Sequence, residues 1–280
     1  MDIRYSANPV DFKHYTTEEV RDEFLVSGLY QPDLVVPVYS HVDRMVVFGV
    51  MPVSETVPIS KGIDVMKSFG TSHFLERREA GVFNLGGPGV CKVDGTAYPM
   101  RPKDCVYITK GAKEVTFESE NGSNPARFYG VSAPAHRTCK TMLLTQADAV
   151  KIPMGSIETS NKRVINQFIH PDVLETCQLV MGMTILESGS VWNSMPAHTH
   201  ERRMEIYSYF DIPEGNSVFH LMGEPQQTRH ITMQNYEAVI SPSWSIHAGC
   251  GTASYTFIWA MGGENQTFSD MGGIAIPDLR

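Results

Sequence analysis

The fold and the chemistry of this chain both follow from the stretch Pro196-Ala-His-Thr-His-Glu-Arg-Arg-Met-Glu205. His198 and His200 are two residues apart, so on a β-strand both imidazoles project from the same face. Glu205 follows after a stretch about the length of a short turn, which returns its carboxylate to that face. A fourth donor, His247, ends a distant Ser-Pro-Ser-Trp-Ser-Ile-His run. This donor set suits zinc, iron or manganese, so the sequence predicts a metal site.

Two other interpretations of the paired histidines are weaker. A helical metalloprotease needs His-Glu-x-x-His, but from His200 the chain continues as His-Glu-Arg-Arg-Met, without the second imidazole. A pair of surface histidines on a polar strand is the plain alternative. The additional donors Glu205 and His247 favour metal binding over that alternative.

The composition is that of a globular protein, since 42% of the 280 residues are apolar and 19% are charged. This length fits one large domain or two of ordinary size. No apolar run reaches the roughly 18 residues of a membrane-spanning helix, and the N-terminus lacks the apolar core of a signal peptide, so we expect a cytoplasmic protein without membrane contact. The net charge of −8 argues against a nucleic-acid partner, although a local cluster of Arg or Lys could bind a small anion.

The five cysteines are widely spaced and odd in number, and no Cys-x-x-Cys occurs. Neither a disulfide framework nor a zinc–thiolate site is therefore indicated. We expect buried, reduced thiols at Cys91, Cys105, Cys139, Cys177 and Cys250.

Most of the chain consists of short apolar runs broken by Gly, Pro and Asp, which is typical of an all-β sandwich or barrel. Asp94-Gly95, between two of these runs, favours a tight hairpin turn. Three short helices are expected: one over 17–26 that begins at the Thr16 capping box, one near 63–68, and a brief capped one at Thr145-Gln-Ala-Asp148. The predicted strands are 45–50, 81–85, 90–93, 105–108, 114–118, 127–131, 176–186, 203–210, 217–222, 230–234, 238–241 and 255–260.

The two halves of the chain also resemble each other. Glu76-Arg-Arg-Glu79 echoes Glu201-Arg-Arg-Met-Glu205, and this alignment sets His73 on His198. The similarity indicates that one β-rich unit occurs twice.

The first copy lacks most of the metal donors. Leu75 falls where His200 stands, and the partner of the last histidine falls near Lys113, which cannot donate to a metal while it is charged. We therefore predict two tandem domains: a lead-in with a β-domain lacking metal ligands over 1–150, and a metal-binding β-domain over 151–280.

The spacing of the four donors resembles the two metal motifs of the cupin superfamily, whose antiparallel β-barrels carry such donors on their inward faces. Longer runs across nearly the whole chain are similar to one family in particular, the bacterial 5-keto-4-deoxyuronate isomerases. These runs are Glu-Phe-Leu-Val at 23–26, Tyr-Ser-His-Val-Asp-Arg at 39–44, Phe-Leu-Glu-Arg-Arg-Glu at 74–79, Lys-Gly-Ala-Lys-Glu-Val at 110–115, Pro-Asp-Val-Leu-Glu-Thr-Cys-Gln-Leu at 171–179, His-Thr-His-Glu-Arg-Arg-Met-Glu at 198–205, Ser-Pro-Ser-Trp-Ser-Ile-His at 241–247 and Gly-Glu-Asn-Gln at 263–266.

The resemblance implies an enzyme of two tandem cupin domains that acts in pectin and uronate catabolism and assembles as a homohexamer. It also implies one zinc ion per subunit, held by His198, His200, Glu205 and His247. The implied reaction interconverts 5-dehydro-4-deoxy-D-glucuronate, a small anionic sugar, and 3-deoxy-D-glycero-2,5-hexodiulosonate. In this reaction the substrate carbonyl moves from C1 to C2 through an enediol or enediolate, and a metal ion can stabilise the negative charge of the enediolate.

The sequence does not identify the residue that moves the proton. Tyr207 and Tyr209 share the face of Glu205 by strand alternation and are weak candidates, although plain packing of the barrel explains both better. For the substrate carboxylate the weak candidates are Arg202, Arg203 and Arg163. Arg229 and His230 are weaker candidates for the same carboxylate. Gln178, Trp192, Trp244 and Trp259 are candidates for the pocket wall, although a structural role explains each better.

Three classes of function stay open from the residues themselves. The first is the isomerase. The second is a cupin oxygenase that uses Fe(II) on the same four donors, because the donor set alone does not separate zinc from iron. The third is a non-enzymatic sugar-binding cupin.

Overall fold

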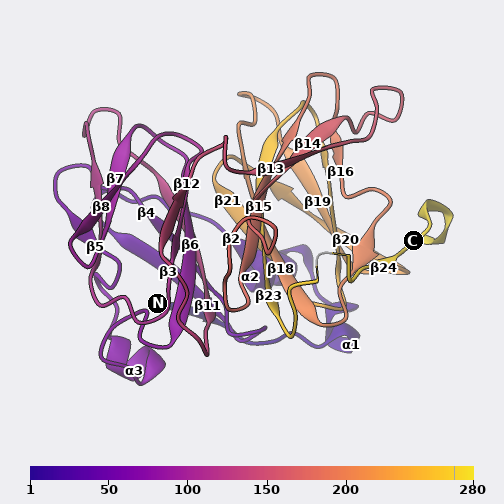
Figure 1. Cartoon of the computed structure of the whole chain (residues 1–280). Helices are drawn as coiled ribbons and strands as arrows, with labels where there is room; N and C mark the ends of the chain where they lie inside the picture. The colour runs from indigo at the N-terminus through magenta and orange to yellow at the C-terminus, as the bar shows by residue number, and fades with distance from the viewer. Residues whose placement is uncertain (268) are drawn as a thin grey trace. The chain divides into compact units, whose positions relative to one another are not determined.

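The computed structural model describes residues 1–267 and 269–280, and most of their regular structure is β-strand (Figure 1). The all-β fold class predicted from the sequence is therefore confirmed. The described part of the chain divides into two compact units. The first comprises Met1–Ile3, Gly28–Ala149 and Phe168–Val180, and the second comprises Arg4–Ser27, Val150–Gln167 and Met181–Arg280.

Each unit is built around one larger and one smaller sheet. In the first, the larger sheet has the order β1 (Asp2–Arg4), β3 (Val35–Ser40), β4 (Val46–Val50), β11 (Phe128–Pro134), β6 (Arg78–Asn84), β9 (Cys105–Ile108) and β12 (Met142–Leu144). The smaller sheet has the order β5 (Val57–Pro58), β10 (Val115–Ser119), β7 (Gly89–Val93) and β8 (Thr96–Met100).

The second unit repeats this arrangement. Its larger sheet has the order β13 (Val150–Met154), β14 (Arg163–Ile169), β15 (Val180–Leu186), β23 (Thr256–Gly263), β18 (Arg203–Phe210), β21 (Glu237–Ser241) and β2 (Leu25–Val26). Its smaller sheet has the order β16 (Trp192–Asn193), β22 (Ile246–Gly251), β19 (Val218–Glu224) and β20 (Gln227–Met233), and β17 (His198–Thr199) pairs separately with β24 (Gly272–Gly273).

The strand order supports the repeat predicted from the sequence. In the first unit β6 lies between β11 and β9, and in the second β18 lies between β23 and β21. Both central strands are antiparallel to their two neighbours. Both strands begin at the second arginine of the Glu-Arg-Arg echo, Arg78 and Arg203. Domain boundaries at 1–150 and 151–280 stay a prediction. The compact units divide the chain differently, since residues 4–27 group with the second unit and residues 168–180 with the first.

Helices are few and short: α1 (Pro9–Phe12), α2 (Thr17–Phe24), α3 (Val65–Phe69) and a 3₁₀ turn (Ile276–Asp278). Two of the predicted helices correspond to α2, which begins at the Thr16 capping box, and to α3, which ends at Gly70 with a φ of +64°. The third is wrong, since residues 146–148 form only a turn. The sequence reasoning missed α1. No helix in residues 1–267 and 269–280 is long and apolar enough to cross a membrane.

Residues 4–27 belong to the second unit and pack against the rest of it. Phe12 is fully buried, with its ring centre 5.2 Å from that of Trp244 and 5.5 Å from that of Phe24. The carbonyl of Lys13 accepts a hydrogen bond from Arg229 (2.9 Å). The α2 helix thus buries its apolar face against the unit that contains the predicted metal donors.

The strand predicted over 176–186 is shorter than expected. It begins only at Val180, because the backbone N–H groups of Cys177, Gln178 and Leu179 all donate to the buried carboxylate of Glu79 instead of to a neighbouring strand. Such long-range capture of backbone donors leaves no local sequence pattern.

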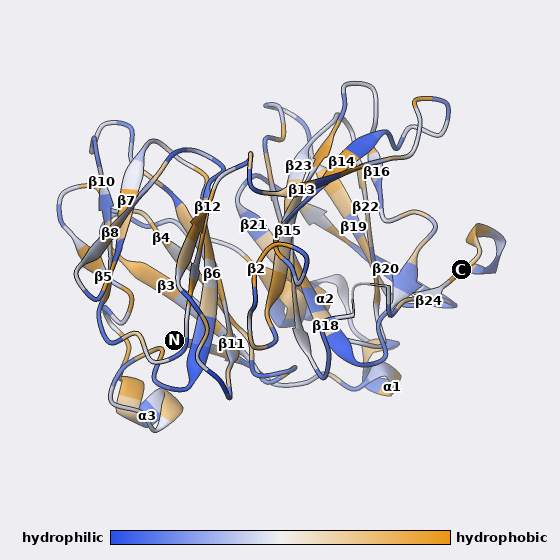
Figure 2. Ribbon diagram, in the orientation of Figure 1, coloured by the Kyte–Doolittle hydropathy of each residue, from blue (hydrophilic) through white to orange (hydrophobic). Residues whose placement is uncertain are grey.

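The first unit fills its interior with apolar side chains. Leu75, which aligns with His200, is 1% exposed and belongs to the same buried cluster as Phe74 and Ala112. Figure 2 shows hydrophobic residues along the strands of both units. The aligned position of the first unit therefore contributes to its core and carries no metal donor.

Candidate metal centre

The structure brings the four predicted donors together within the second unit. His198 lies in β17, His200 follows directly, and a turn then leads into β18, which carries Glu205. His247 comes from β22. His200, Glu205 and His247 are buried, and His198 is partly exposed.

The donor atoms have the spacing of ligands to one ion. Nε2 of His247 lies 2.7 Å from Oε2 of Glu205 and 3.0 Å from Nε2 of His198. Nε2 of His200 lies 3.1 Å from the same carboxylate oxygen, and all four ligand atoms lie within 4.8 Å of one another. Two donors bound at about 2.1 Å to one ion are about 3 Å apart, so the group fits a single divalent cation. Within residues 1–267 and 269–280, no other group of three or more His, Cys, Asp or Glu side chains is so placed.

Backbone groups orient one of the ligands. Nδ1 of His200 lies 2.8 Å from the carbonyl oxygen of Asp270, which places the proton on Nδ1 and leaves Nε2 free to face the other donors. The segment that supplies this carbonyl is fixed by the pairing of β24 with β17, where Gly273 lies opposite His198. The C-terminal segment therefore positions the metal-binding strand.

Electrostatics favour the protonation states that a metal requires. Burial alone would raise the pKa of Glu205, but His247 and His200 outweigh it and hold that pKa well below its usual range. Burial, together with the charge of His247, lowers the pKa of His198 to about 3. Near neutral pH the site thus presents a carboxylate and a neutral imidazole, the forms that bind a cation.

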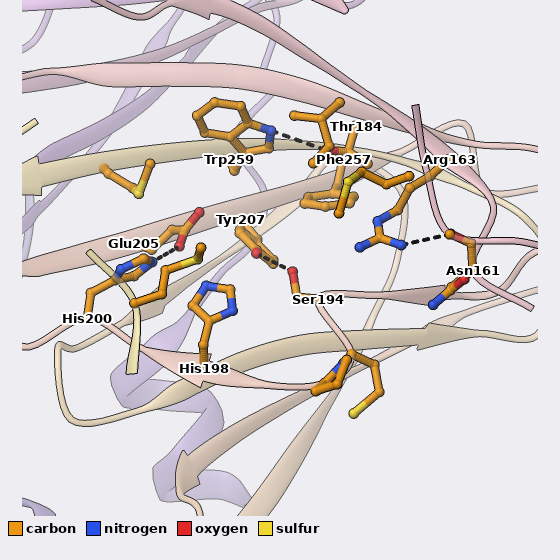
Figure 3. Close-up of a pocket in the computed structure, with 17 residues that line it drawn as sticks. Asn161, Arg163, Thr184, Ser194, His198, His200, Glu205, Tyr207, Phe257 and Trp259 are labelled. Atoms are coloured by element: carbon orange, nitrogen blue, oxygen red, sulfur yellow. Dashed lines mark hydrogen bonds and ion pairs between the residues drawn. The ribbon is translucent and has the colours of Figure 1, made fainter. Parts of the chain in front are cut away.

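Three of the donors line a cavity of about 390 Å³ (Figure 3). This volume lies within the range of about 300–1,000 Å³ that is usual for small-molecule sites. One wall is apolar and includes Ile165, Phe257, Trp259 and Met261. The cavity can therefore surround a small ligand and hold part of it away from water.

Arg163 lies at the far end of this cavity from His200 and Glu205 (Figure 3). Its Nη1 donates to the carbonyl of Asn161 (2.8 Å), which leaves most of the five guanidinium N–H donors for other partners. Among the described residues, no carboxylate forms an ion pair with it. A buried arginine of this kind can bind an anionic group of a ligand.

Tyr207 and Tyr209 have different surroundings, although both extend from β18 on the face of Glu205. Tyr207 lines the cavity, and its hydroxyl lies 2.8 Å from Oγ of Ser194. The Tyr209 hydroxyl lies 2.8 Å from Nδ1 of His220, and Tyr209 is not among the cavity-lining residues. Of the two, only Tyr207 can touch a ligand in this cavity.

The two arginines of the metal motif point elsewhere. The Arg202 side chain is 63% exposed, and its Nε lies 3.5 Å from a carboxylate oxygen of Glu264. Arg203 is 1% exposed, and its Nη2 lies 3.1 Å from Nδ1 of His200, behind that ligand. Neither lines the cavity, so the structure favours Arg163 for an anionic group.

Of the weaker candidates for the pocket, Trp259 lines the cavity and donates through Nε1 to Oγ1 of Thr184 (3.2 Å). The remaining ones do not line it: Arg229, His230, Gln178, Trp192 and Trp244. Sequence reasoning missed Ser194, which lines the cavity next to the Tyr207 hydroxyl. Neither its positive φ nor this contact can be read from the sequence.

Another buried histidine, His220, lies in this unit outside the donor group. Nδ1 of His220 is bonded to the Tyr209 hydroxyl, and Nε2 lies 3.3 Å from Oγ of Ser241. Burial, followed by the charge of His247, lowers the pKa of His220 to about 3. The folded chain therefore keeps this imidazole neutral where the unfolded chain would protonate it.

This difference predicts a pH-dependent stability. Below about pH 6.5 the unfolded chain binds a proton at His220 that the folded chain refuses until about pH 3, so the free energy of unfolding falls as the pH is lowered through this range. In metal-free protein we expect His220→Gln to reduce this slope by up to about 1.4 kcal/mol per pH unit. Urea titrations between about pH 4 and pH 6 measure it. Equal slopes in the two proteins would contradict the prediction.

Known proteins match the chain over its whole length. The model of the KduI/IolB family matches residues 55–272. The chain is 53% identical to a 4-deoxy-L-threo-5-hexosulose-uronate ketol-isomerase from Enterobacter sp. (strain 638), 51% to one from Lachnoclostridium phytofermentans and 52% to one from Escherichia coli O8. Each alignment spans 280 residues and covers 100% of both chains.

Solved structures show the same fold at low sequence identity. An IolB-like protein from Salmonella typhimurium has a TM-score of 0.66 at 15% identity, with 82% of this chain and 87% of that chain covered. A vicilin from tomato has a TM-score of 0.54 at 8% identity, with 80% and 76% covered. These similarities concern the arrangement of strands alone.

Proposed function

Because this chain belongs to the KduI/IolB family, we propose that it is a ketol-isomerase that interconverts 5-dehydro-4-deoxy-D-glucuronate and 3-deoxy-D-glycero-2,5-hexodiulosonate. The full-length relatives carry the name of this activity, at 51–53% identity. The observation that supports it most directly is the cavity, which has metal donors at one end and Arg163 at the other.

The substrate and the cavity have the same order of chemical groups. The substrate is an open chain with an aldehyde at C1, hydroxyls at C2 and C3, a methylene at C4, a ketone at C5 and a carboxylate at C6. The two reacting carbons are at the end opposite the carboxylate. If Arg163 binds the carboxylate, C1 and C2 extend toward His198, His200 and Glu205.

We propose that the four donors hold zinc, one ion per subunit. A divalent ion supplies Lewis-acid chemistry, which polarises the carbonyl and lowers the cost of charge at the neighbouring oxygens. The chain contributes the position of the donors, through the Asp270 carbonyl on His200 and the buried charge of Glu205. Iron or manganese on the same donors is the alternative that metal analysis distinguishes.

The other residues bind and orient the substrate. Arg163 offers the remaining N–H groups of its guanidinium to the C6 carboxylate, which a planar guanidinium binds more specifically than a lysine ammonium does. Burial raises the pKa of Tyr207 well above its usual value, so its hydroxyl is a neutral hydrogen-bond donor or acceptor at the substrate. Phe257 and Trp259 exclude water from one side of the carbon chain of the substrate.

The setting of the reaction is also part of the proposal. The resemblance of the chain to the isomerase family supports a homohexamer in the cytoplasm that takes part in pectin and uronate breakdown. Static light scattering on the purified protein measures the number of subunits. The two domains over 1–150 and 151–280 belong to the same proposal.

An assay in the absence of oxygen tests the proposed activity. We expect the purified protein to convert the product of unsaturated-uronate breakdown, followed as loss of aldehyde, at the same rate with and without oxygen. A chelator should abolish turnover, and added zinc should restore it. Oxygen consumption would favour an Fe(II) oxygenase. Binding without turnover in the metal-loaded protein would favour a sugar-binding cupin.

A further inference from the structure

Ser194 and Tyr207 form a hydroxyl pair inside the cavity. Oγ of Ser194 lies 2.8 Å from the Tyr207 hydroxyl, and both residues line the cavity. Because one hydroxyl donates to the other, the pair keeps one free O–H and several lone pairs. The pair can therefore donate a hydrogen bond to one ligand oxygen and accept one from the same group.

The position of the pair limits which ligand oxygen it meets. In Figure 3 the Tyr207 side chain lies beside the metal donors, and Ser194 lies between it and Arg163. Tyr207 extends from the same strand and the same face as Glu205. When one end of a ligand lies at the metal donors, the hydroxyl pair is thus nearest to the next atoms along the ligand toward Arg163.

The backbone of Ser194 is held in an unfavourable conformation. Its φ is +47°, in the left-handed region that residues with a Cβ atom rarely adopt. Glycine would adopt this conformation without strain, yet the chain has a serine whose hydroxyl points at Tyr207. Strain of this kind persists where the side chain is needed in one place, as in binding sites.

We propose that Ser194 and Tyr207 together bind the C3 hydroxyl of the substrate and make the enzyme specific for substrates that carry it. The inference rests on the proposed function and deepens it. With C1 and C2 at the metal donors and C6 at Arg163, C3 is the next carbon that bears oxygen, and C4 bears none. A hydroxyl both donates and accepts, which matches what the paired hydroxyls offer.

Removing either hydroxyl tests the pair. We expect Tyr207→Phe and Ser194→Ala each to lower kcat/KM about 30-fold, because a lost hydrogen bond to bound substrate leaves its partner unpaired. The double variant should lose little more than either single one, since the pair acts as a unit. Metal content should be unchanged in all three.

Two further variants separate binding from folding. Ser194→Gly removes the hydroxyl and suits the positive φ, so the protein should be at least as stable as the wild type while its kcat/KM falls as in Ser194→Ala. Tyr209→Phe removes a buried phenol of the same strand that is bonded to His220 outside the cavity lining, and its kcat/KM should stay within about 3-fold of the wild type.

A substrate analogue that lacks the C3 hydroxyl completes the experiment. The wild type should convert it with about 30-fold lower kcat/KM, and the Tyr207→Phe and Ser194→Gly variants should show no further loss on it. Variants that match the wild type on the full substrate would overturn the inference and leave the isomerase function standing. A wild type that fails to convert the full substrate with metal bound would overturn both.

Discussion

Glu205→Gln should lower kcat/KM by about 1000-fold or more. The substitution keeps the size of the side chain but removes the one negative charge among the four donors. Oε2 of Glu205 lies 2.7 Å from Nε2 of His247 and 3.1 Å from Nε2 of His200. A bound metal ion contributes several kcal/mol to the stabilisation of developing charge, and about 4 kcal/mol corresponds to a factor of about 1000. The variant should also retain much less metal after dialysis, as measured by elemental analysis.

Glu201→Gln is the matched control. Glu201 is exposed and lies in the turn before β18, so this variant makes the same change of charge outside the donor group. We expect its metal content and kcat/KM to equal those of the wild type. A Glu205→Gln protein that kept both its metal and its activity would show that this carboxylate is not a ligand.

The sequence predicts the parts of the site that depend on local geometry. The spacing of His198 and His200 needs only the alternation of side chains along a strand, and the structure has both imidazoles beside Glu205. The helix that follows the N-cap Thr16 is equally local, because the capping box lies within four residues. Such features are fixed by the nearest neighbours in the chain.

The remaining parts depend on segments that are distant in sequence. The carbonyl that orients His200 belongs to Asp270, and no pattern in the sequence indicates that β24 pairs with β17. The carboxylate of Glu79 accepts hydrogen bonds from three backbone N–H groups nearly a hundred residues away. For this reason the strand predicted over 176–186 begins only at Val180. Predicting these contacts requires the packed fold, because backbone N–H and C=O groups are present in nearly every residue and the sequence does not mark which of them are used.

The choice among arginines shows the same limit. Arg202 and Arg203 are next to the metal motif in sequence. Arg202, however, lies in the exposed turn before β18, and Arg203, the first residue of that strand, extends behind His200. Arg163 comes from β14, far away in sequence, and lines the cavity. Proximity in the chain therefore does not indicate which arginine lines the cavity, because the order of strands in the sheet decides it.

Arg163→Met should raise KM and lower kcat/KM by about 100-fold or more. Methionine keeps an unbranched apolar stem of similar width but removes the guanidinium and its charge. A charge-assisted bond to a carboxylate contributes about 1.5–3 kcal/mol, and the loss of a buried partner adds to it. Because the carboxylate is remote from the reacting carbons, most of the effect should be in binding, although poorer placement of C1 and C2 would also lower kcat.

Arg163→Lys and Arg202→Met complete this prediction. Lysine restores the charge without the planar fork, so its kcat/KM should lie between those of Arg163→Met and the wild type. Arg202→Met removes an exposed arginine of the metal motif, and its kinetics should match the wild type. An analogue whose carboxylate is replaced by an amide should be converted equally well by the wild type and Arg163→Met. If Arg202→Met were the variant that lost affinity, the substrate carboxylate would lie outside this cavity.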